Sequence, residues 1–439
     1  MKIYIETLGC ARNQVDGEMM AGQFARAGFT HAEEPEEAEI IVINTCGFIE
    51  EAINESIDTI LYLAEFKQKG VCRLLVVAGC LTQRFGEKIT ADLTEVDLFL
   101  GTGALDQVPE LIKKALPKGT CFLPDPYGRH FQDNSEIRRT DAQSPFAYLK
   151  IAEGCDKHCT YCIIPALRGK QKSRPMADIV KEAQSLIQNH KKEIILVAQE
   201  TTFYGRDLEG SSNIADLLDK ISILSQDIWI RLLYGHPESV DENLIRTMAS
   251  HENICPYFDI PIQHASDGIL KRMGRNYKIK DLYRLVERIR KHLPEAVLRT
   301  TVITGFPGET RKDFNALMSF IREIQFDHLG AFVYSDFDDL PSHRLKGFVS
   351  ERTAKRRQDE IMACQRDIST LINRKYQDRE LAVLIEESPE PGLYMGRTVF
   401  QAPEVDGITY VRSRELDRGA FTKVRITDTL EYDLIGEPA

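Results

Sequence analysis

The sequence predicts an α/β protein in three parts: an N-terminal parallel, doubly wound α/β domain, a central open (β/α)6 barrel and a small C-terminal antiparallel β-barrel. Two regions of the chain, one before residue 117 and one after residue 141, each contain buried strand patterns that alternate with helical patterns. Beyond Arg374 the hydrophobic period changes to two, as expected for short antiparallel strands. We therefore expect domains at residues 1–117, 141–372 and 373–439, with a Pro-bearing, charged linker at 118–140.

Composition limits the function classes. The chain has 439 residues, a net charge of −11 and a pI near 5.5, which removes the overall electrostatic attraction expected of a dedicated nucleic-acid binder. No apolar run approaches the roughly 18 residues that span a bilayer, and Glu6 stands where a signal peptide needs apolar residues. We expect a cytoplasmic protein without membrane association, whose ten cysteines are reduced and available for metal ligation or catalysis.

Three predicted strands of the first domain each end at a cysteine. Residues 2–8, 39–45 and 73–79 lead to Cys10, Cys46 and Cys80, with helical patterns at about 14–27 and 50–67 between them and a fourth strand near 97–101. In such sheets ligands bind beyond the carboxyl ends of the strands, so the three thiols could bind a single ligand there. This pattern favours a three-thiolate iron–sulfur cluster.

The polar residues beside these cysteines have two interpretations. Asn13, Asn44 and Thr45 can act directly at the site or can serve ordinary turn chemistry. The remaining cysteines lack partners at ligand spacing, and we expect them to be incidental: Cys72, Cys121, Cys255 and Cys364.

A second group of cysteines opens the central domain. Cys155, Cys159 and Cys162 place three thiols in eight residues directly after a strand-like run. A structural zinc site needs four closed ligands, and no second Cys or His pair follows to complete one. A cubane cluster on three thiolates leaves one iron open for a cofactor or substrate. Two alternatives to a cluster site are a group of reduced cysteines on a loop and an incomplete zinc knuckle.

Strands and helices then alternate through the central domain. Strands are expected at 193–199, 229–234, 258–263, 298–305 and 328–335, and helices at 175–189, 240–250, 280–292 and 309–324. Six units in series indicate an open barrel with function at the carboxyl ends of the strands. Polar residues and a glycine collect at those ends: Gln199, Glu200, Tyr234, His236, Gln263, His264, Gly305, Tyr334 and Ser335.

The C-terminal part begins with a charged helix at 351–372. Five alternating runs follow at 381–386, 394–400, 408–412, 421–427 and 430–436, which predict a five-stranded barrel. From Arg374 onward, 2 Lys and 7 Arg face 5 Asp and 8 Glu, a net charge of −4. An acidic barrel repels phosphates and suits a basic protein partner, although the charge could also serve solubility alone.

The motifs resemble known families. Cys155, Cys159 and Cys162, with Tyr161 before the last cysteine, resemble the radical S-adenosylmethionine (SAM) enzymes, whose open iron is chelated by the methionine moiety of SAM. Nearly the whole chain resembles the methylthiotransferases, and its last part resembles the TRAM domain. The segments that carry the likeness are 8–13, 44–48, 78–80, 168–169, 173–175, 259–266 and 305–310.

The resemblance implies two [4Fe-4S] clusters, one on Cys10, Cys46 and Cys80 and one on Cys155, Cys159 and Cys162. It also implies that Gln199, Gln263 and Arg299 face SAM, with the Tyr161 backbone near the adenine. From the residues alone, each Gln could instead make a structural hydrogen bond, Arg299 an ion pair, and His264 a core contact. In the implied chemistry, one SAM methylates a sulfur held at the first cluster. A second SAM is cleaved reductively to a 5′-deoxyadenosyl radical, which takes hydrogen from an unactivated carbon that then collects the methylthio group.

Segments 198–205 and 401–407 look like the branch that modifies the β-carbon of an aspartate in small-subunit ribosomal protein S-twelve. The implied partners are that protein, free or in the subunit, and a low-potential electron donor such as flavodoxin or ferredoxin; nucleic acid is the less favoured substrate. Segment 336–341 and Glu200 depart from the pattern usual in these relatives, so the resemblance does not determine the shape of the loop on the substrate side. The alternatives are a methylthiotransferase for transfer-RNA adenosine, as N6-isopentenyladenosine or threonylcarbamoyladenosine, and a two-cluster electron carrier, which would need fully ligated clusters.

Overall fold

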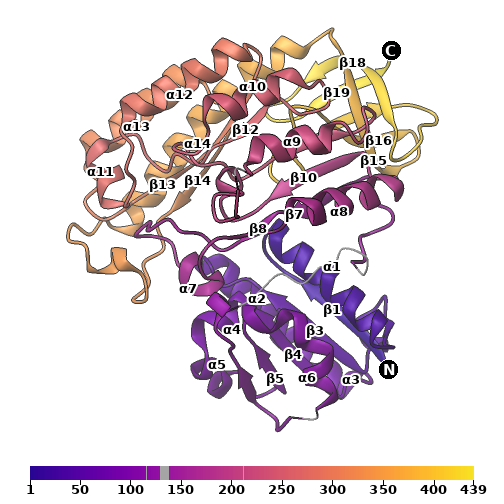
Figure 1. Ribbon diagram of the computed structural model, residues 1–439. Helices are drawn as coiled ribbons and strands as arrows, with labels where there is room; N and C mark the ends of the chain where they lie inside the picture. The colour runs from indigo at the N-terminus through magenta and orange to yellow at the C-terminus, as the bar shows by residue number, and fades with distance from the viewer. Residues whose placement is uncertain (115, 129–137, 211) are drawn as a thin grey trace. The chain divides into compact units, whose positions relative to one another are not determined.

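The computed structural model describes residues 1–114, 116–128, 138–210 and 212–439, which divide into two compact units. The first contains Met1–Asp141, Tyr148–Lys157 and Ile163–Glu182, and the second contains Ala142–Ala147, His158–Cys162 and Ala183–Ala439 (Figure 1). Within the described ranges, none of the helices combines the length and apolar character that a membrane span requires.

The first unit is built on a six-stranded sheet in which all neighbouring strands are parallel. Its order is β2-β1-β3-β4-β5-β6, so the direction of winding reverses between β1 and β3. This order defines a doubly wound sheet with a topological switch point at β1 and β3, and it confirms the predicted fold class. The strands are β1 (Lys2–Thr7), β2 (Thr30–His31), β3 (Ile40–Thr45), β4 (Leu74–Gly79), β5 (Leu98–Leu100) and β6 (Thr120–Phe122).

Helices cover both faces of this sheet because alternate strand residues are apolar on both sides. Met20 and Phe24 of α1 (Ala11–Arg26) share one core with Ile40 and Val42 of β3, and α6 (Val108–Lys113) packs on the same face. Ile41 and Ile43 of β3 are fully buried and point to the opposite face. The remaining helices are α2 (Glu50–Ala64), α3 (Phe66–Lys69), α4 (Cys80–Phe85) and α5 (Glu87–Asp92) (Figure 1).

Two features of this unit differ from the sequence-based expectation. Strand β6 lies inside the stretch expected to be a linker, because the β-branched and aromatic residues Thr120 and Phe122 suit a short edge strand beside β5. Residues 129–137 of that stretch lie outside the described residues. Helix α1 begins at Ala11, directly after the extended Cys10, rather than near residue 14.

The second unit contains the strands of the predicted open barrel. They form two three-stranded sheets, β11-β10-β7 and β12-β13-β14. Backbone hydrogen bonds from Ile230 to Asn253 and from Cys255 to Ile230 connect the neighbourhoods of β11 and β12. The strands are β7 (Phe146–Lys150), which runs from the second unit into the first, β10 (Glu193–Val197), β11 (Trp229–Leu232), β12 (Tyr257–Asp259), β13 (Val297–Thr304) and β14 (His328–Val333). Strand β12 is shorter than predicted because Pro261 lacks the N–H that would extend its pairing.

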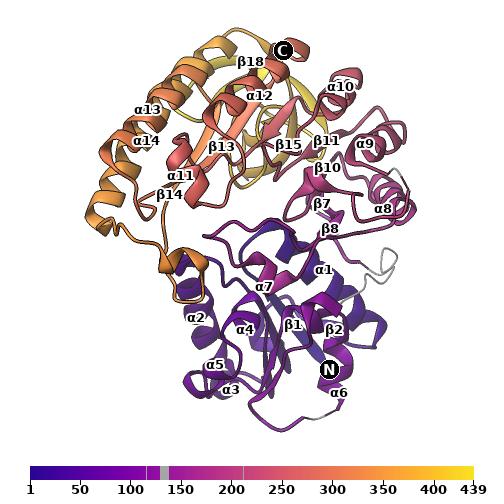
Figure 2. The ribbon, with the colours of Figure 1, turned by 60° about the vertical axis from the view of Figure 1, so that its left-hand side comes forward.

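Helices form the outer layer around these strands, as Figure 2 shows. Local sequence sets their starts: Thr310 and Asp313 form a capping box at the start of α13, and Ser350 caps α14. Helix α9 was not predicted. The helices are α8 (Met176–Gln188), α9 (Ile214–Ser222), α10 (Glu242–Ser250), α11 (Asp267–Arg272), α12 (Ile279–His292), α13 (Arg311–Ile324) and α14 (Glu351–Asn373).

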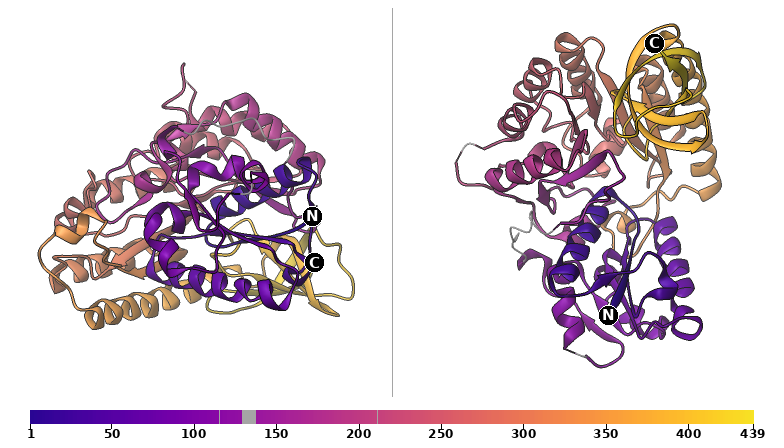
Figure 3. Two further views of the ribbon diagram at one scale, coloured as in Figure 1. Left: turned by 90° about the horizontal axis from the view of Figure 1, so that it is seen from below. Right: turned by 90° about the vertical axis from the view of Figure 1, so that its right-hand side faces the viewer.

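The C-terminal strands close into a barrel with the order β15-β16-β17-β19-β18 (Figure 3). One pairing corrects the expectation of an antiparallel barrel, because β17 and β19 are parallel. A closed ring of five strands cannot alternate direction at every pair, so at least one pair must be parallel. The strands are β15 (Glu380–Glu390), β16 (Leu393–Thr398), β17 (Thr409–Arg412), β18 (Phe421–Thr429) and β19 (Leu434–Pro438).

A buried charge network fastens this small barrel to the larger one. Glu193, the first residue of β10, accepts from Arg231 Nε and from Arg397 Nη2 at 2.6 Å each. Arg397 also pairs with Glu386 of β15 at 2.5 Å. Glu193, Arg231 and Arg397 are no more than 1% exposed, so each charge depends on its partners.

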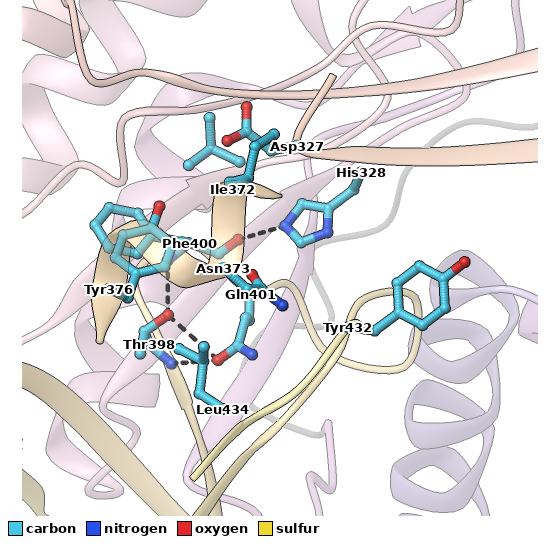
Figure 4. A pocket seen from close by; sticks show the side chains of 11 residues that line it. Asp327, His328, Ile372, Asn373, Tyr376, Thr398, Phe400, Gln401, Tyr432 and Leu434 are labelled. Atoms are coloured by element: carbon cyan, nitrogen blue, oxygen red, sulfur yellow. Dashed lines mark hydrogen bonds between the residues drawn. The ribbon is translucent and has the colours of Figure 1, made fainter. Parts of the chain in front are cut away.

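The same seam is closely packed beside this network. His328 Nε2 donates to the carbonyl of Phe400 at 2.9 Å, and the rings of Tyr376 and Phe400 stack (Figure 4). A cavity of only about 10 Å³ remains between these residues, which leaves room for about one water molecule. The two barrels therefore form a continuous interior in the second unit.

We expect Glu193→Gln to destabilise this seam by about 3–5 kcal/mol, because it leaves two buried guanidinium groups with too little negative charge. Burial opposes ionisation of Glu193, but Arg231 and Arg397 outweigh it and lower the pKa of the carboxyl. Its contribution is complete above the unfolded pKa and is lost as the pH falls through the lower folded pKa.

Urea unfolding monitored by fluorescence of Trp229 measures this effect, because the chain's only tryptophan contacts Phe421 of β18 at the same seam. Glu380→Gln is the matched control, since Glu380 forms an exposed pair with Lys423 and should leave the urea midpoint unchanged. Equal midpoints for the two variants would contradict the role given to Glu193.

Candidate metal and cofactor sites

The three thiols of the first unit lie where the sequence placed them, at the carboxyl ends of parallel strands. Cys10 follows β1, Cys46 follows β3, and Cys80 follows β4. Cys10 and Cys46 therefore flank the switch point of the sheet, which is the usual ligand position in doubly wound folds.

Glycines let the three loops approach one another. Gly9 has φ +92°, and a Cβ at this position would stand 2.8 Å from Cys46 Cβ. Gly79 has φ +101°, and its Cβ would stand 2.8 Å from the Thr45 carbonyl oxygen. Larger residues at either position would separate the cysteine loops.

Hydrogen bonds to backbone carbonyls hold the same loops. Asn13 Nδ2 donates to Leu8 O and Thr45 O, and Asn44 Nδ2 donates to Asn13 O. Thr45 Oγ1 donates to Ala78 O at 2.7 Å. These contacts favour the structural interpretation of Asn13, Asn44 and Thr45, because each side chain ties one cysteine-bearing loop to the next.

The electrostatic environment differs among the thiols. Burial opposes ionisation of Cys10, but Arg12, the Asn13 backbone and Arg168 outweigh it and lower the thiol pKa. Burial and the neighbouring Cys80 raise the pKa of Cys46 to about 11, and burial likewise raises that of Cys80 despite the opposing charge of Arg168. Ionised thiols at these three positions would repel one another, which contributes to the raised pKa values of Cys46 and Cys80.

This donor set fits an iron–sulfur cluster. Three thiolates with cationic side chains nearby can bind a cubane, in which each thiolate ligates a different iron. Among the described residues, no three His, Cys, Asp or Glu side chains converge closely enough to hold one metal ion. Separate thiolates around a multinuclear cluster do not require such convergence.

The second cysteine motif is divided between the two units. Cys155 belongs to the first, where its N–H donates to Gly169 O, and Gly154 at φ +81° allows this close approach. Cys159 and Cys162 belong to the second, where the Cys162 N–H donates to Cys159 O. Between them, Thr160 donates from its N–H to Met273 O and from Oγ1 to Arg272 O, which anchors this part of the loop to α11.

Tyr161 is also fixed within the second unit. Its hydroxyl accepts from Arg275 Nη2 at 2.5 Å, and its ring packs against a core of Ile269, Met273 and Phe306. Phe306 lies in the Gly305–Gly308 segment that follows β13. The Tyr161 side chain thus holds the cysteine loop in place. The expected position of the Tyr161 backbone near the adenine of SAM stays a prediction.

Two residues at the carboxyl ends of barrel strands adopt an unusual backbone conformation. Tyr234 after β11 has φ +62°, and Gln263 after β12 has φ +65°. Non-glycine residues at positive φ carry strain, and such strain is enriched at functional sites. Gln263 is held there by hydrogen bonds with the Thr301 and Ile303 backbones, while Gln199 lies partly exposed just beyond β10. Gln199 and Gln263 thus both follow barrel strands, and their role in SAM binding stays a prediction.

Arg299 and His264 fit their structural alternatives better. Arg299 pairs with Asp259 at 2.9 Å and with Asp406 of the C-terminal barrel at 3.4 Å, near the amino end of β13. His264 is fully buried, and its Nδ1 accepts from the Ala265 and Ser266 backbones at 2.9 Å. Its Nε2 lies 3.7 Å from Glu309 Oε1.

Sequence reasoning missed a network of buried charges beside the first triad. Lys150 pairs with Asp16 at 2.5 Å and with Glu153 at 2.8 Å, and Arg168 pairs with Asp16 at 2.7 Å. All four residues are 2–5% exposed and belong to the first unit. The available signal was their charge within otherwise apolar or Gly-rich stretches, but Asp16 is more than 130 positions from the other three residues, so no local pattern links it to them.

Comparison with known families assigns all three parts of the chain. Residues 2–101 match the uncharacterized protein family UPF0004, residues 149–321 match the radical SAM superfamily, and residues 379–438 match the TRAM domain.

Several relatives align with nearly the whole chain. A protein of Desulfosudis oleivorans is 50% identical over 439 residues, covering 100% of both chains. Proteins of Clostridioides difficile and Geobacter sulfurreducens are 44% and 43% identical, covering 100% and 99% of this chain and 98% of each relative. All three are named ribosomal protein uS12 methylthiotransferase RimO.

Solved structures show the same fold at low identity. The radical SAM methyltransferase TsrM from Kitasatospora setae, solved with cobalamin and a [4Fe-4S] cluster, has a TM-score of 0.58 at 14% identity, covering 89% of this chain and 81% of its own. The cobalamin-dependent radical enzyme OxsB has a TM-score of 0.55 at 11% identity, covering 84% and 56%.

We expect Gly9→Ala to reduce the iron retained after anaerobic reconstitution, because the added Cβ collides with Cys46 and separates two of the three thiols. Iron analysis of protein that still folds, judged by circular dichroism, provides the measurement. Gly28→Ala is the control: Gly28 has φ +88°, but its Cβ would meet no described atom within 4 Å. Equal iron loss in both variants would mean that backbone strain alone is responsible.

Proposed function

Because the chain belongs to the RimO family of ribosomal protein uS12 methylthiotransferases, we propose that it transfers a methylthio group to the β-carbon of an aspartate in uS12. In this reaction a C–H bond of the aspartate is replaced by a C–S bond. Full-length similarity to an enzyme family favours this transferase over a two-cluster electron carrier.

Cys10, Cys46 and Cys80 would hold one four-iron cluster, and Cys155, Cys159 and Cys162 would hold the other. The first assignment is supported by three thiols at neighbouring strand ends around the switch point. The second is supported by the cysteine spacing and by the match to the radical SAM superfamily. When bound, the clusters would pass an electron from a low-potential donor to SAM for its reductive cleavage, and SAM would also supply the methyl group of the methylthio unit.

The chain's own residues would position the cysteine loops and SAM. Gly9 and Gly79 permit the close approach of the first three cysteine loops, and Asn13 and Thr45 fix them. In the second unit, Thr160 and Tyr161 anchor the cysteine loop, while Gln199 and Gln263 offer amide groups at the carboxyl ends of strands. We assign these two amides to SAM binding, and the ion-paired Arg299 to support of the barrel.

Charge supports a protein substrate. The C-terminal domain carries −4 and the chain −11, whereas nucleic-acid binding gains most of its affinity from cations near phosphates. A basic ribosomal protein matches this surface better than transfer RNA does.

The two triads should be separable by cluster content. We predict two four-iron clusters in the reconstituted protein, one of which is lost in Cys155→Ala and the other in Cys46→Ala. Cys46→Ala should still cleave SAM to 5′-deoxyadenosine yet form no methylthio product. Iron and sulfide analysis with chromatography of both products tests this. Full iron content in Cys155→Ala would refute the second ligand set.

The substrate is tested by offering the reconstituted enzyme two substrates in parallel. A uS12 loop peptide containing the aspartate should gain a methylthio group, whereas unmodified transfer RNA should remain unchanged. Peptides in which Asn or Glu replaces the aspartate serve as controls, and mass spectrometry reports each reaction. Methylthiolated adenosine with an unmodified peptide would assign the chain to transfer RNA instead.

A further inference from the structure

Arg168 lies within hydrogen-bonding distance of a thiol from the other cysteine motif. It ends helix α7 (Ile164–Arg168), directly after the second motif in the sequence, yet its Nη2 donates to Cys80 Sγ at 3.3 Å. Both residues belong to the first unit, and both are less than 10% exposed. The contact concerns the cluster proposed for Cys10, Cys46 and Cys80, so the inference rests on the proposed function.

The guanidinium group is held in this position from two sides. Nη1 donates to Asp16 Oδ2 at 2.7 Å, and Nη2 donates to Asn13 Oδ1 at 2.6 Å. Asn13 is itself fixed by the carbonyls of Leu8 and Thr45. Arginine suits this site because its planar fork can satisfy several acceptors at once, whereas lysine offers a single charged centre.

A buried cation and an N–H donor at a cluster sulfur have a definite electrical effect. One-electron reduction adds negative charge to the cluster and its thiolates. A nearby positive charge stabilises the reduced form more than the oxidised form, and the low local dielectric strengthens this preference. Hydrogen bonds to the sulfurs and net charge are known determinants of cluster potentials.

We propose that Arg168 tunes the cluster on Cys10, Cys46 and Cys80 by raising its reduction potential through the hydrogen bond to Cys80 Sγ. Arg168 is thus a positioning residue that acts through a ligand. It also couples the segment after the second motif to the first cluster site.

The test uses the full chain with Cys155, Cys159 and Cys162 replaced by Ala, so that only the first triad can bind a cluster. A redox titration with a low-potential chemical reductant, followed by electron paramagnetic resonance, gives its midpoint potential. Removing Arg168 alone would leave buried acids unbalanced, so Asp16→Asn serves as the reference and Asp16→Asn with Arg168→Gln as the test variant.

We expect the test variant to show at least a tenfold lower ratio of reduced to oxidised cluster at a fixed potential than Asp16→Asn does, which equals a downward shift of about 59 mV for a one-electron couple. Arg168→Lys should lower the midpoint potential by a smaller amount, measured against the triple-alanine background without further changes. Arg138→Lys is the control, because Arg138 is a buried arginine of the same unit that pairs with Glu18 and Glu182, and it should leave the potential unchanged.

The outcomes separate the two levels of inference. Unchanged potentials in the test variant and in Arg168→Lys, with the cluster present, overturn the role of Arg168 and leave the proposed function intact. If the double variant fails to fold, the Arg168→Lys potential decides the question alone. Absence of any cluster in the triple-alanine background overturns both the cluster site and the tuning role.

Discussion

The buried charges of Asp16, Lys150, Glu153 and Arg168 are the constraint on which the first unit depends. Placing two acids and two bases in an interior is costly, and only their mutual pairing offsets that cost. The network joins helix α1, which follows Cys10, to the strand and helix that flank the second cysteine motif. Arg168 contacts Asn13 and Cys80 as well as Asp16. The same pairing that holds the unit together therefore also fixes one thiol of the first triad.

The parts of the fold that follow from local periodicity could be predicted from the sequence. The strands and helices of both α/β parts, the cysteines that follow strands and the five short C-terminal strands each carry a local pattern of a few residues, so pattern reasoning finds them. The closure of five strands also dictates a parallel pair, although sequence patterns alone did not identify β17 and β19 as that pair.

The parts that could not be predicted depend on pairing between distant residues. Arg299 shows this most clearly, since its position in a barrel strand was compatible with a cofactor contact or an ion pair. Its partners, Asp259 and Asp406, are 40 or more positions away, and only the folded chain brings them together. For the same reason, the Arg168 contact to Cys80 and the approach of His264 to Glu309 leave no trace in local sequence patterns.

In the second unit, the residues that hold the C-terminal barrel and the candidate cofactor residues lie at opposite ends of the strands. Four residues that fasten the C-terminal barrel stand at or near the amino ends of strands: Glu193, Tyr257, Arg299 and His328. The strained Tyr234 and Gln263 lie at the carboxyl ends, where barrel enzymes bind their ligands. The acidic C-terminal domain is therefore docked at the end of the barrel opposite the candidate cofactor face. A partner that contacts both surfaces would therefore have to extend along the length of the barrel.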